Sequence, residues 1–394
     1  MKKIVLAVFA LIILIYLFLG PIPIPINLGR IDFTAYWSTA YLLARSENFS
    51  DSNTLLTVEQ TWAMWDGDFP IKAWNPPWLL PLLLPYTLVP FQRAVWLWFN
   101  SNIILVFTAS VMAWISSANK ESVSKRAWLA PLISFVFAPL LTGLYMGQVN
   151  TLVYFGLAAM LYFADRNRLL LSGSALTLTI VKPHLVYVTI PILLLSAVYK
   201  KEWRFVAGFL GTLLGLTAVT FALRPSFIGE YIASSTSNNL LSWQTPTLGG
   251  ILNFLFGWEE AVLMSLLVLP LSIIWWWTQK DRLLLTELTH ITVFISIITA
   301  PFGWGYDAII LMIPILQIIV WVFEGHYSRT MNILLIGSLV LIDVSAIYQR
   351  TRMNNEVFAF WLPIILAFLY LLARRQKGLF SQLNVLNELE RLRD

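Results

Sequence analysis

The sequence predicts an all-α polytopic membrane protein with about twelve transmembrane helices (ten to thirteen), and two observations carry this prediction. The 394-residue chain is 58% hydrophobic and only 12% charged, whereas soluble domains contain about 25% charged residues. Its apolar residues also gather in runs close to the roughly 20 residues that a helix needs to cross the hydrocarbon core. The chain has no cysteine, which excludes disulfides, thiolate nucleophiles and cysteine metal ligands.

The expected spans follow the apolar runs in chain order. The first, "MKKIVLAVFALIILIYLFLG", has two lysines and a long apolar run but no small-x-small cleavage site, so we interpret it as an uncleaved signal anchor. The runs 168–182 and 185–199 are short and could be half-helices, and the proline-broken run 78–90 suits an interfacial or re-entrant segment. The twelve spans are expected near 4–20, 92–116, 127–144, 148–164, 168–182, 185–199, 204–223, 259–278, 284–300, 305–323, 330–348 and 356–373.

The basic residues orient these spans. With the N-terminus inside, the short inside connections hold most of the 26 Lys and Arg residues, as the positive-inside rule requires. The net charge of +5 therefore reflects cytoplasmic loops and does not call for a nucleic-acid partner. We expect a multi-pass protein of the cell membrane with both termini in the cytoplasm. The basic residues left outside are Arg30, Arg45, Lys72, Arg93, Lys182, Arg224, Arg350 and Arg352.

We expect a single integral-membrane domain over residues 1–378 and a short cytoplasmic amphipathic tail at 379–394. Two long segments, about 21–91 and 224–258, fall outside and are rich in Trp, Pro, Asn, Ser and Thr. The first of them contains "DFTAYWSTAYLLA", which predicts an interfacial helix. Polar residues that are costly at membrane depth therefore cluster on the outer side, where we place the functional site.

Asp32 lies where the chain leaves the first expected span, in "RIDFTAYWSTAYLLA". Asp is a favoured helix N-cap, and a helix-like stretch follows it. A carboxylate at the membrane edge could equally act as a general base in a pocket. Both interpretations stay open from the residues alone, and both hold together if another group caps the helix.

Lys182 and His184, in "TIVKPHLVY", are ionisable residues between two apolar runs. Such residues are functional candidates by default, although a lysine can also snorkel to the outer headgroups. The functional interpretation is a cationic site for an anionic group, because a Lys ammonium binds phosphate as a point charge. The other two histidines, His290 and His326, map to other depths, so we expect no cofactor; a divalent metal is not indicated by these residues, and metal dependence stays open.

Several outer polar and aromatic residues suit a hydroxyl-rich ligand. Amides bind hydroxyls well, and Trp faces stack on sugar rings, although capping and interfacial anchoring explain the same residue types. The sequence has no P-loop, no G-x-G-x-x-G between a strand and a helix, no H-E-x-x-H and no G-x-S-x-G. The candidate sugar- or acceptor-binding residues are Tyr36, Asn75, Gln148, Asn150, Trp243, Gln244 and Asp307.

Five stretches together resemble the C-type integral-membrane glycosyltransferases, and most closely glycosyltransferase family 87, the polyprenyl-phosphate-mannose-dependent type. They are "DFTAYWSTAYLLA", "WNPPWLLPLLLPYTLVP", "GQVNTLVYFGLAAMLYF", "LSGSALTLTIVKPHLVYVTIPILLL" and "SWQTPTLGGILN", with a weaker match in "APFGWGYDAIILMIPIL". In this chain Pro183 follows Lys182 directly, whereas related sequences often have a residue or two between them. The resemblance implies a GT-C-like fold and a membrane-embedded glycosyltransferase.

The resemblance also implies a reaction. A sugar, most simply mannose, would pass from a polyprenyl-phosphate carrier to a lipid or glycan acceptor on the extracytoplasmic face, as part of glycolipid or cell-envelope glycan synthesis. Asp32 would be the catalytic base of an inverting displacement, and Lys182 with His184 would hold the donor phosphate. The main alternative is a polytopic transporter or lipid or glycolipid flippase without glycosyl transfer, and a non-catalytic assembly protein is a second. Transporters usually show internal repeats, and none is visible here.

Overall fold

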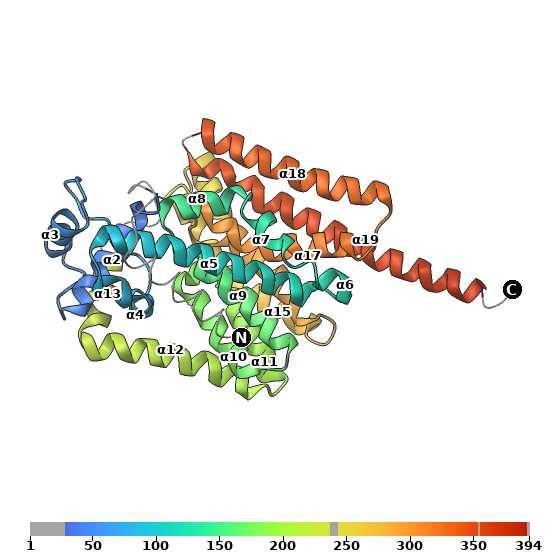
Figure 1. The fold of residues 1–394 in the computed structure, drawn as a ribbon, viewed down its shortest axis with the longest axis horizontal. Helices are drawn as coiled ribbons and strands as arrows, with labels where there is room; N and C mark the ends of the chain where they lie inside the picture. The colour runs from blue at the N-terminus through green and yellow to red at the C-terminus, as the bar shows by residue number, and fades with distance from the viewer. Residues whose placement is uncertain (1–27, 237–242, 354, 392–394) are drawn as a thin grey trace, which may run out of the picture. The chain divides into compact units, whose positions relative to one another are not determined.

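The computed structural model describes residues 28–236, 243–353 and 355–391 (Figure 1). Every regular element in these ranges is a helix, which confirms the all-α prediction for this part of the chain. The first expected span, near 4–20, lies outside the described residues. The chain divides into two compact units. Unit 1 comprises Met1–Leu105, Gly143–Val149 and Leu213–Asn238, and unit 2 comprises Val106–Thr142, Asn150–Thr212 and Asn239–Asp394. The single domain over 1–378 stays a prediction.

Unit 1 is built on short helices around an aromatic core. The prolines of residues 77–88 divide that run into three short helical pieces, as expected from the loss of N–H donors. The ring of Phe33 stacks on Trp98 with centroids 5.3 Å apart. The Trp98 ring in turn meets Tyr86 edge to face at 5.4 Å. Among the described residues, the elements that lie wholly in unit 1 are α2 (Ile31–Ala44), α3 (Ser52–Trp62), η1 (Pro77–Leu79), α4 (Leu80–Leu83), η2 (Leu84–Leu88) and α13 (Phe227–Thr236).

The division of the chain into two units falls inside three helices. They are α5 (Phe91–Ser117), α8 (Ala138–Met146) and α12 (Trp203–Leu223). The elements that lie wholly in unit 2 are α6 (Glu121–Ser124), α7 (Leu129–Ser134), α9 (Asn150–Asp165), α10 (Leu169–Thr177), η3 (Leu178–Val181), η4 (Pro183–Val186), α11 (Thr189–Tyr199), α14 (Leu248–Phe256), η6 (Glu259–Leu263), α15 (Met264–Gln279), α16 (Leu285–Thr299), η7 (Gly305–Leu311), α17 (Met312–Phe323), α18 (Arg329–Arg352), η8 (Glu356–Phe360) and α19 (Trp361–Arg391).

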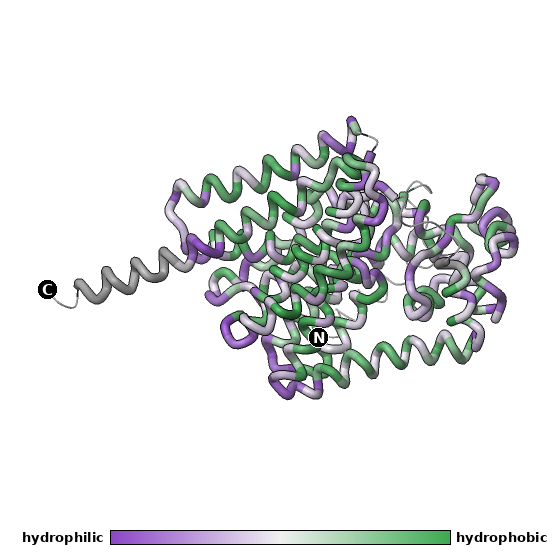
Figure 2. Tube along the Cα trace, turned by 180° about the vertical axis from the view of Figure 1, so that it is seen from behind, coloured by the Kyte–Doolittle hydropathy of each residue, from purple (hydrophilic) through white to green (hydrophobic). Residues whose placement is uncertain are grey.

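The core of unit 2 lies around α17. Of the apolar window that η7 and α17 form, 89% is buried inside the protein, whereas only 11% of the α18 window is buried. A helix that is apolar all round and buried belongs to the centre of a large core, so α17 is central in this unit. The exposed apolar side chains of α18 include Ile333, Leu341 and Tyr348. They suit contact with lipid, and Figure 2 shows hydrophobic residues along this helix.

Six helical segments of the described chain are long and apolar enough to cross a membrane. They are Phe91–Ser117, Trp203–Leu223, Glu259–Gln279, Gly305–Phe323, Arg329–Arg352 and Glu356–Gly378. Other expected spans form shorter pieces: α7 ends at Ser134 and α8 begins at Ala138 inside the run 127–144, and the runs 168–182 and 185–199 each combine a 3₁₀ helix with an α-helix. The chain is therefore a helical membrane protein, and the count of twelve spans stays a prediction. The expected tail at 379–394 is helical to Arg391, as the continuation of α19.

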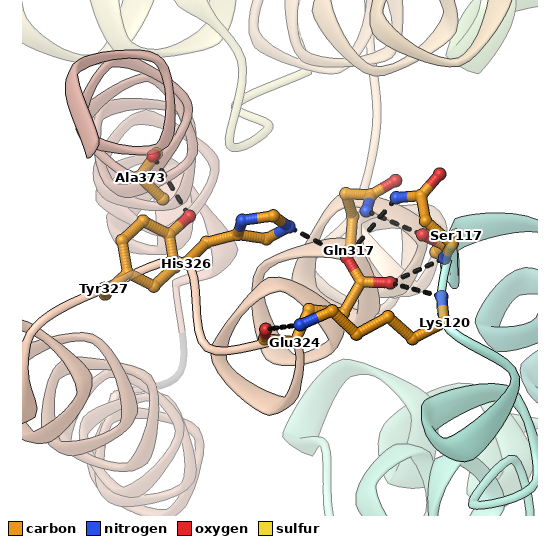
Figure 3. Close-up of polar contacts among 8 residues, drawn as sticks. Ser117, Lys120, Gln317, Glu324, His326, Tyr327 and Ala373 are labelled. Atoms are coloured by element: carbon orange, nitrogen blue, oxygen red, sulfur yellow. Dashed lines mark hydrogen bonds and ion pairs between the residues drawn. The ribbon is translucent and has the colours of Figure 1, made fainter. Parts of the chain in front are cut away.

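A buried carboxylate joins the end of α5 to the end of α17 in unit 2 (Figure 3). Glu324 accepts hydrogen bonds from the backbone N–H groups of Asn119, at 2.6 Å, and Lys120, at 3.1 Å. The Nε2 atom of His326 lies 3.0 Å from Oε2 of Glu324. The Lys120 ammonium donates to the backbone carbonyl of Glu324. Burial alone would raise the pKa of Glu324. The hydrogen bonds to its carboxylate from the Asn119 and Lys120 backbone and from His326 outweigh burial and hold the pKa below its usual value. The cluster therefore fixes the connection 118–120 to the turn after α17 with an ionised carboxylate.

A second buried carboxyl, Glu59 of α3, gives unit 1 a predicted pH dependence. The residue is fully buried, its Oε2 accepts the Ile71 N–H at 2.9 Å, and its Oε1 has no hydrogen-bond partner among the described residues. Burial raises its pKa from 4.5 to about 7, against the opposing effect of the Ile71 N–H. Between about pH 4.5 and about pH 7, the Glu59 carboxyl therefore keeps its proton in the folded state but has lost it in the unfolded state. The free energy of unfolding therefore falls by up to about 3 kcal/mol as the pH rises through this interval.

Thermal unfolding of the purified protein in detergent at about pH 5 and about pH 8 tests this prediction. Glu59→Gln keeps the size of the side chain and removes the titration, so its transition should depend less on pH than that of the wild type. The matched control is Glu47→Gln, an exposed acid of the same unit, which should behave like the wild type. Equal pH dependence in the wild type and Glu59→Gln would contradict the assignment.

Candidate active-site groups

The predicted base, Asp32, lies in the first turn of α2 and is half-buried. Its interpretation as a helix N-cap is wrong, because α2 begins at Ile31 and its N-cap residue is Arg30, which makes no side-chain capping bond. The Oδ2 atom of Asp32 instead accepts a hydrogen bond of 2.6 Å from the side-chain amide of Gln148. The carboxylate is therefore directed across unit 1 toward a residue far away in the sequence.

Gln148 holds Asp32 from a tightly packed turn. Its Nε2 donates to Asp32, while its Oε1 accepts a 3.0 Å hydrogen bond from the Tyr36 hydroxyl, and both Gln148 and Tyr36 are buried. Gly147 before it has φ +79°, and a Cβ there would stand 2.1 Å from the carbonyl oxygen of Gly29. Only glycine fits so close a backbone approach. Sequence reasoning named Tyr36 and Gln148 as ligand-binding residues; the structure connects them to Asp32.

Unit 2 contains a buried ion pair between two other predicted site residues. The Lys182 ammonium lies 2.7 Å from Oδ1 of Asp307, and the two side chains are 4% and 1% exposed. Lys182 lies between η3 and η4, and Pro183 begins η4. The break between these two 3₁₀ helices therefore positions the Lys182 side chain against Asp307. The second oxygen of Asp307 accepts the Trp304 N–H at 3.0 Å. The sequence predicted separate roles for this Lys and this Asp, and the structure brings them together.

Aromatic rings surround the ion pair. The Lys182 ammonium lies 4.9 Å from the ring centroid of Tyr306 and 5.9 Å from that of Trp304, within the range of cation–π attraction. The Tyr306 and Trp304 rings are nearly parallel at 6.1 Å, and Trp243 meets Trp304 and Phe302 edge to face. Of these rings only Trp243 was a sequence candidate. The run "PFGWGYD", with glycines between aromatics, was the available signal for the other three.

His184 lies beside this aromatic group. Its ring centroid is 4.3 Å from that of Phe302, and its Nε2 atom is buried without a hydrogen-bond partner among the described residues. Burial, with the positive charge of Lys182, lowers the pKa of His184 well below its usual value. The imidazole is therefore neutral at physiological pH and can offer one donor and one acceptor. Within the described ranges no group of three or more His, Cys, Asp or Glu residues could hold a metal ion.

The remaining candidates have different surroundings. Asn150 begins α9, and its Nδ2 donates a 2.6 Å hydrogen bond to the Tyr306 carbonyl, which joins α9 to η7. Gln244 is exposed and accepts a 3.4 Å hydrogen bond from Asn355. Asn75 lines a small pocket of unit 1 that also includes Ser50 and Tyr231.

The predicted residues thus form two groups, one in each unit. Unit 1 contains the Asp32 group, in which Gln148 and Tyr36 hold the Asp32 carboxylate. Unit 2 contains the Lys182–Asp307 ion pair and the aromatic rings around it. Glu356 was missed by sequence reasoning, yet its Oε2 accepts the Gly305 N–H at 2.9 Å and so fixes the loop that carries Trp304 and Tyr306. Its position just after α18 looks like that of an ordinary loop acid.

The chain was compared with protein families, curated proteins and solved structures. Residues 74–301 match the family model of glycosyltransferase family 87. The matched range contains Gln148, Asn150, Lys182, His184 and Trp243, and it ends before η7. Neither the curated proteins nor the solved structures gave a match. Because the family model covers more than half of the chain, the chain belongs to glycosyltransferase family 87.

Proposed function

We propose that this membrane glycosyltransferase moves a sugar, most simply mannose, from a polyprenyl-phosphate carrier to a lipid or glycan acceptor on the extracytoplasmic face. Family 87 membership supports glycosyl transfer as the chemistry. The hydrogen-bonded series Tyr36–Gln148–Asp32 is the observation that carries the proposal, because it orients a half-buried carboxylate as a general base requires. The assignment of donor and face rests on the resemblance and on the charge distribution of the loops.

Asp32 would act on the acceptor hydroxyl. As the acceptor oxygen bonds to C1 of the sugar, its proton passes to Asp32, and the bond between C1 and the phosphate oxygen breaks on the opposite face. One carboxylate is enough for such an inverting displacement. The Gln148 amide donates to Oδ2 at 2.6 Å, and an ionised carboxylate can accept several hydrogen bonds on its two oxygens, so this bond does not by itself prevent proton transfer to Asp32.

Lys182 would stabilise the departing lipid phosphate. Charge that develops on a leaving group is best met by fixed cationic donors in a site shielded from water. The ammonium has three N–H donors, of which one is directed to Asp307, so a phosphate oxygen can bind beside the carboxylate or displace it. The neutral His184 would donate one further hydrogen bond to the same group.

The topology proposed with this function has about twelve spans, a GT-C-like fold and cytoplasmic termini. Because the chain has no cysteine, single cysteines report sidedness cleanly. Glu47 and Ser122 are both exposed positions. In intact cells an impermeant maleimide should label Glu47→Cys and leave Ser122→Cys unlabelled until the membrane is opened. The reverse pattern would move the Asp32 group to the cytoplasmic face.

The purified protein tests the reaction directly. In detergent or liposomes it is expected to transfer labelled sugar from a polyprenyl-phosphate sugar to a membrane glycolipid acceptor, with inversion at C1. Donors that carry mannose, glucose or arabinose would identify the sugar, and nucleotide sugars are the control donors. Transfer from a nucleotide sugar alone, or lipid translocation in liposomes without transfer, would contradict the proposal.

A further inference from the structure

Unit 2 contains a pocket, lined by both apolar and polar side chains, that the proposed mechanism does not use. Its cavity volume is about 50 Å³, and about 510 Å³ when the open solvent at its mouth is counted, so a ligand here would lie partly in the mouth. It lies where the last turns of α18, the beginning of η8 and α19, the first turn of α8 and residues 305–306 meet. Figure 1 shows α18 beside α19, which the packing of the two helices confirms. The pocket therefore belongs to the same unit as the Lys182–Asp307 pair.

The wall of this pocket is held by an ion pair. Arg350 of α18 pairs with Oε1 of Glu356, and Oε2 of the same carboxylate accepts the Gly305 N–H at 2.9 Å. A second interaction joins the two sides, because the indole N–H of Trp361 donates to the Gln349 side chain at 2.5 Å. One pocket thus combines a guanidinium, a carboxylate, an amide and an aromatic ring, with small Ala346 on its surface.

These groups decide which ligand class fits. A phosphate needs an excess of donors and positive charge, but Glu356 neutralises Arg350 and would repel an anion. A sugar hydroxyl both donates and accepts, so it needs both kinds of group. Arg350 supplies donors only, Glu356 acceptors only, and the Gln349 amide both. We propose that the Arg350–Glu356 pocket binds an uncharged sugar ring through its hydroxyl groups.

The pocket and the Lys182–Asp307 pair share one loop. Tyr306 lines the pocket, and its ring centroid lies 4.9 Å from the Lys182 ammonium. Gly305 before it is bound by Glu356, and Asp307 after it is bound by Lys182. This inference rests on the proposed function, which it extends with a place for the sugar of the donor or of the acceptor.

Saturation-transfer NMR on the full-length protein in detergent tests the pocket. The probes are the methyl glycosides of mannose, glucose and arabinose, with inorganic phosphate as the anionic probe. Ala346→Leu adds bulk to the pocket wall one turn before Arg350 and leaves both charged groups in place, and Glu356→Gln removes the charge while keeping an acceptor for Gly305. We expect each variant to weaken binding of the preferred glycoside about tenfold or more. A thermal transition like that of the wild type shows that each variant is folded.

Two variants outside the pocket lining serve as controls. Val344→Leu adds bulk to an exposed position of α18, and Arg352→Gln removes a neighbouring charge; both should bind the glycoside like the wild type. In transfer assays, a raised KM for the donor in Ala346→Leu would assign the pocket to the donor sugar, and a raised KM for the acceptor would assign it to the acceptor sugar.

The inference is overturned if no glycoside binds the wild type, if Ala346→Leu and Glu356→Gln bind as the wild type does, or if phosphate competes with the glycoside in the pocket. Glycoside binding needs no lipid donor, so its failure is distinguishable from failure of the proposed function. A protein that binds glycosides here and transfers no sugar refutes only the transfer reaction. Transfer that Ala346→Leu leaves unchanged refutes only the pocket.

Discussion

Asp32→Asn is expected to slow sugar transfer about 10³-fold or more, while the protein remains folded. The amide has nearly the same shape as the carboxylate and can still accept the hydrogen bond from Gln148, so unit 1 keeps its packing. It cannot take the proton that the acceptor hydroxyl must lose as the new glycosidic bond forms. The rate should therefore fall at every donor concentration, with KM for the donor little changed.

Asp51→Asn is the matched control in the same unit. Asp51 caps α3, where its carboxylate accepts the Thr54 N–H at 2.8 Å, and it has no part in the Asp32 group. That variant should transfer sugar at the wild-type rate. Tyr36→Phe removes only the hydroxyl that holds the far end of Gln148, and we expect a loss of no more than about tenfold from this indirect effect. Turnover by Asp32→Asn equal to that of Asp51→Asn would refute the assigned base.

Asp32 was identifiable from the sequence because a carboxylate at the exit of an apolar run is unusual. Its hydrogen-bond partner, Gln148, was not identifiable as such. Gln148 was named for a role in ligand binding, but the sequence contains no signal that folds residues 147–148 onto Gly29 and Asp32, 116 positions away. The same holds for Lys182 and Asp307, which each stood out as ionisable residues beside apolar runs and are separated by 125 positions. Single residues could be predicted because burial of charge is costly, but pairings depend on the tertiary fold.

Helix content followed from hydropathy, because backbone groups in lipid must bond within their own segment. The interruptions were harder to predict. The break between Ser134 and Ala138 falls inside a continuous apolar run, and apolar periodicity alone does not show where a helix bends. The interruption at Lys182 was easier, because Pro183 lacks the N–H that a continuous helix needs. Glu356 escaped notice because its importance arises from the Gly305 N–H that it accepts.

Lys182→Met and Asp307→Asn are each expected to destabilise the protein by about 3 kcal/mol or more, and the double variant is expected to recover most of that loss. The pair is buried at 2.7 Å, so removal of either partner leaves an uncompensated charge, whereas removal of both leaves none. Asn at position 307 still offers an oxygen to the Trp304 N–H. Thermal unfolding of the two single variants and the double variant in one detergent measures this coupling.

Transfer kinetics then separate the structural role of Lys182 from its proposed role in donor binding. If Lys182 holds the donor phosphate, the double variant is folded but its KM for the polyprenyl-phosphate sugar rises about tenfold or more, while KM for the acceptor stays near the wild-type value. Asp307→Asn keeps the ammonium and removes its competing carboxylate, so its affinity for the carrier phosphate should increase. A double variant that regains both stability and wild-type donor KM would show that Lys182 serves only to neutralise Asp307, and the phosphate site would then have to lie elsewhere in the protein.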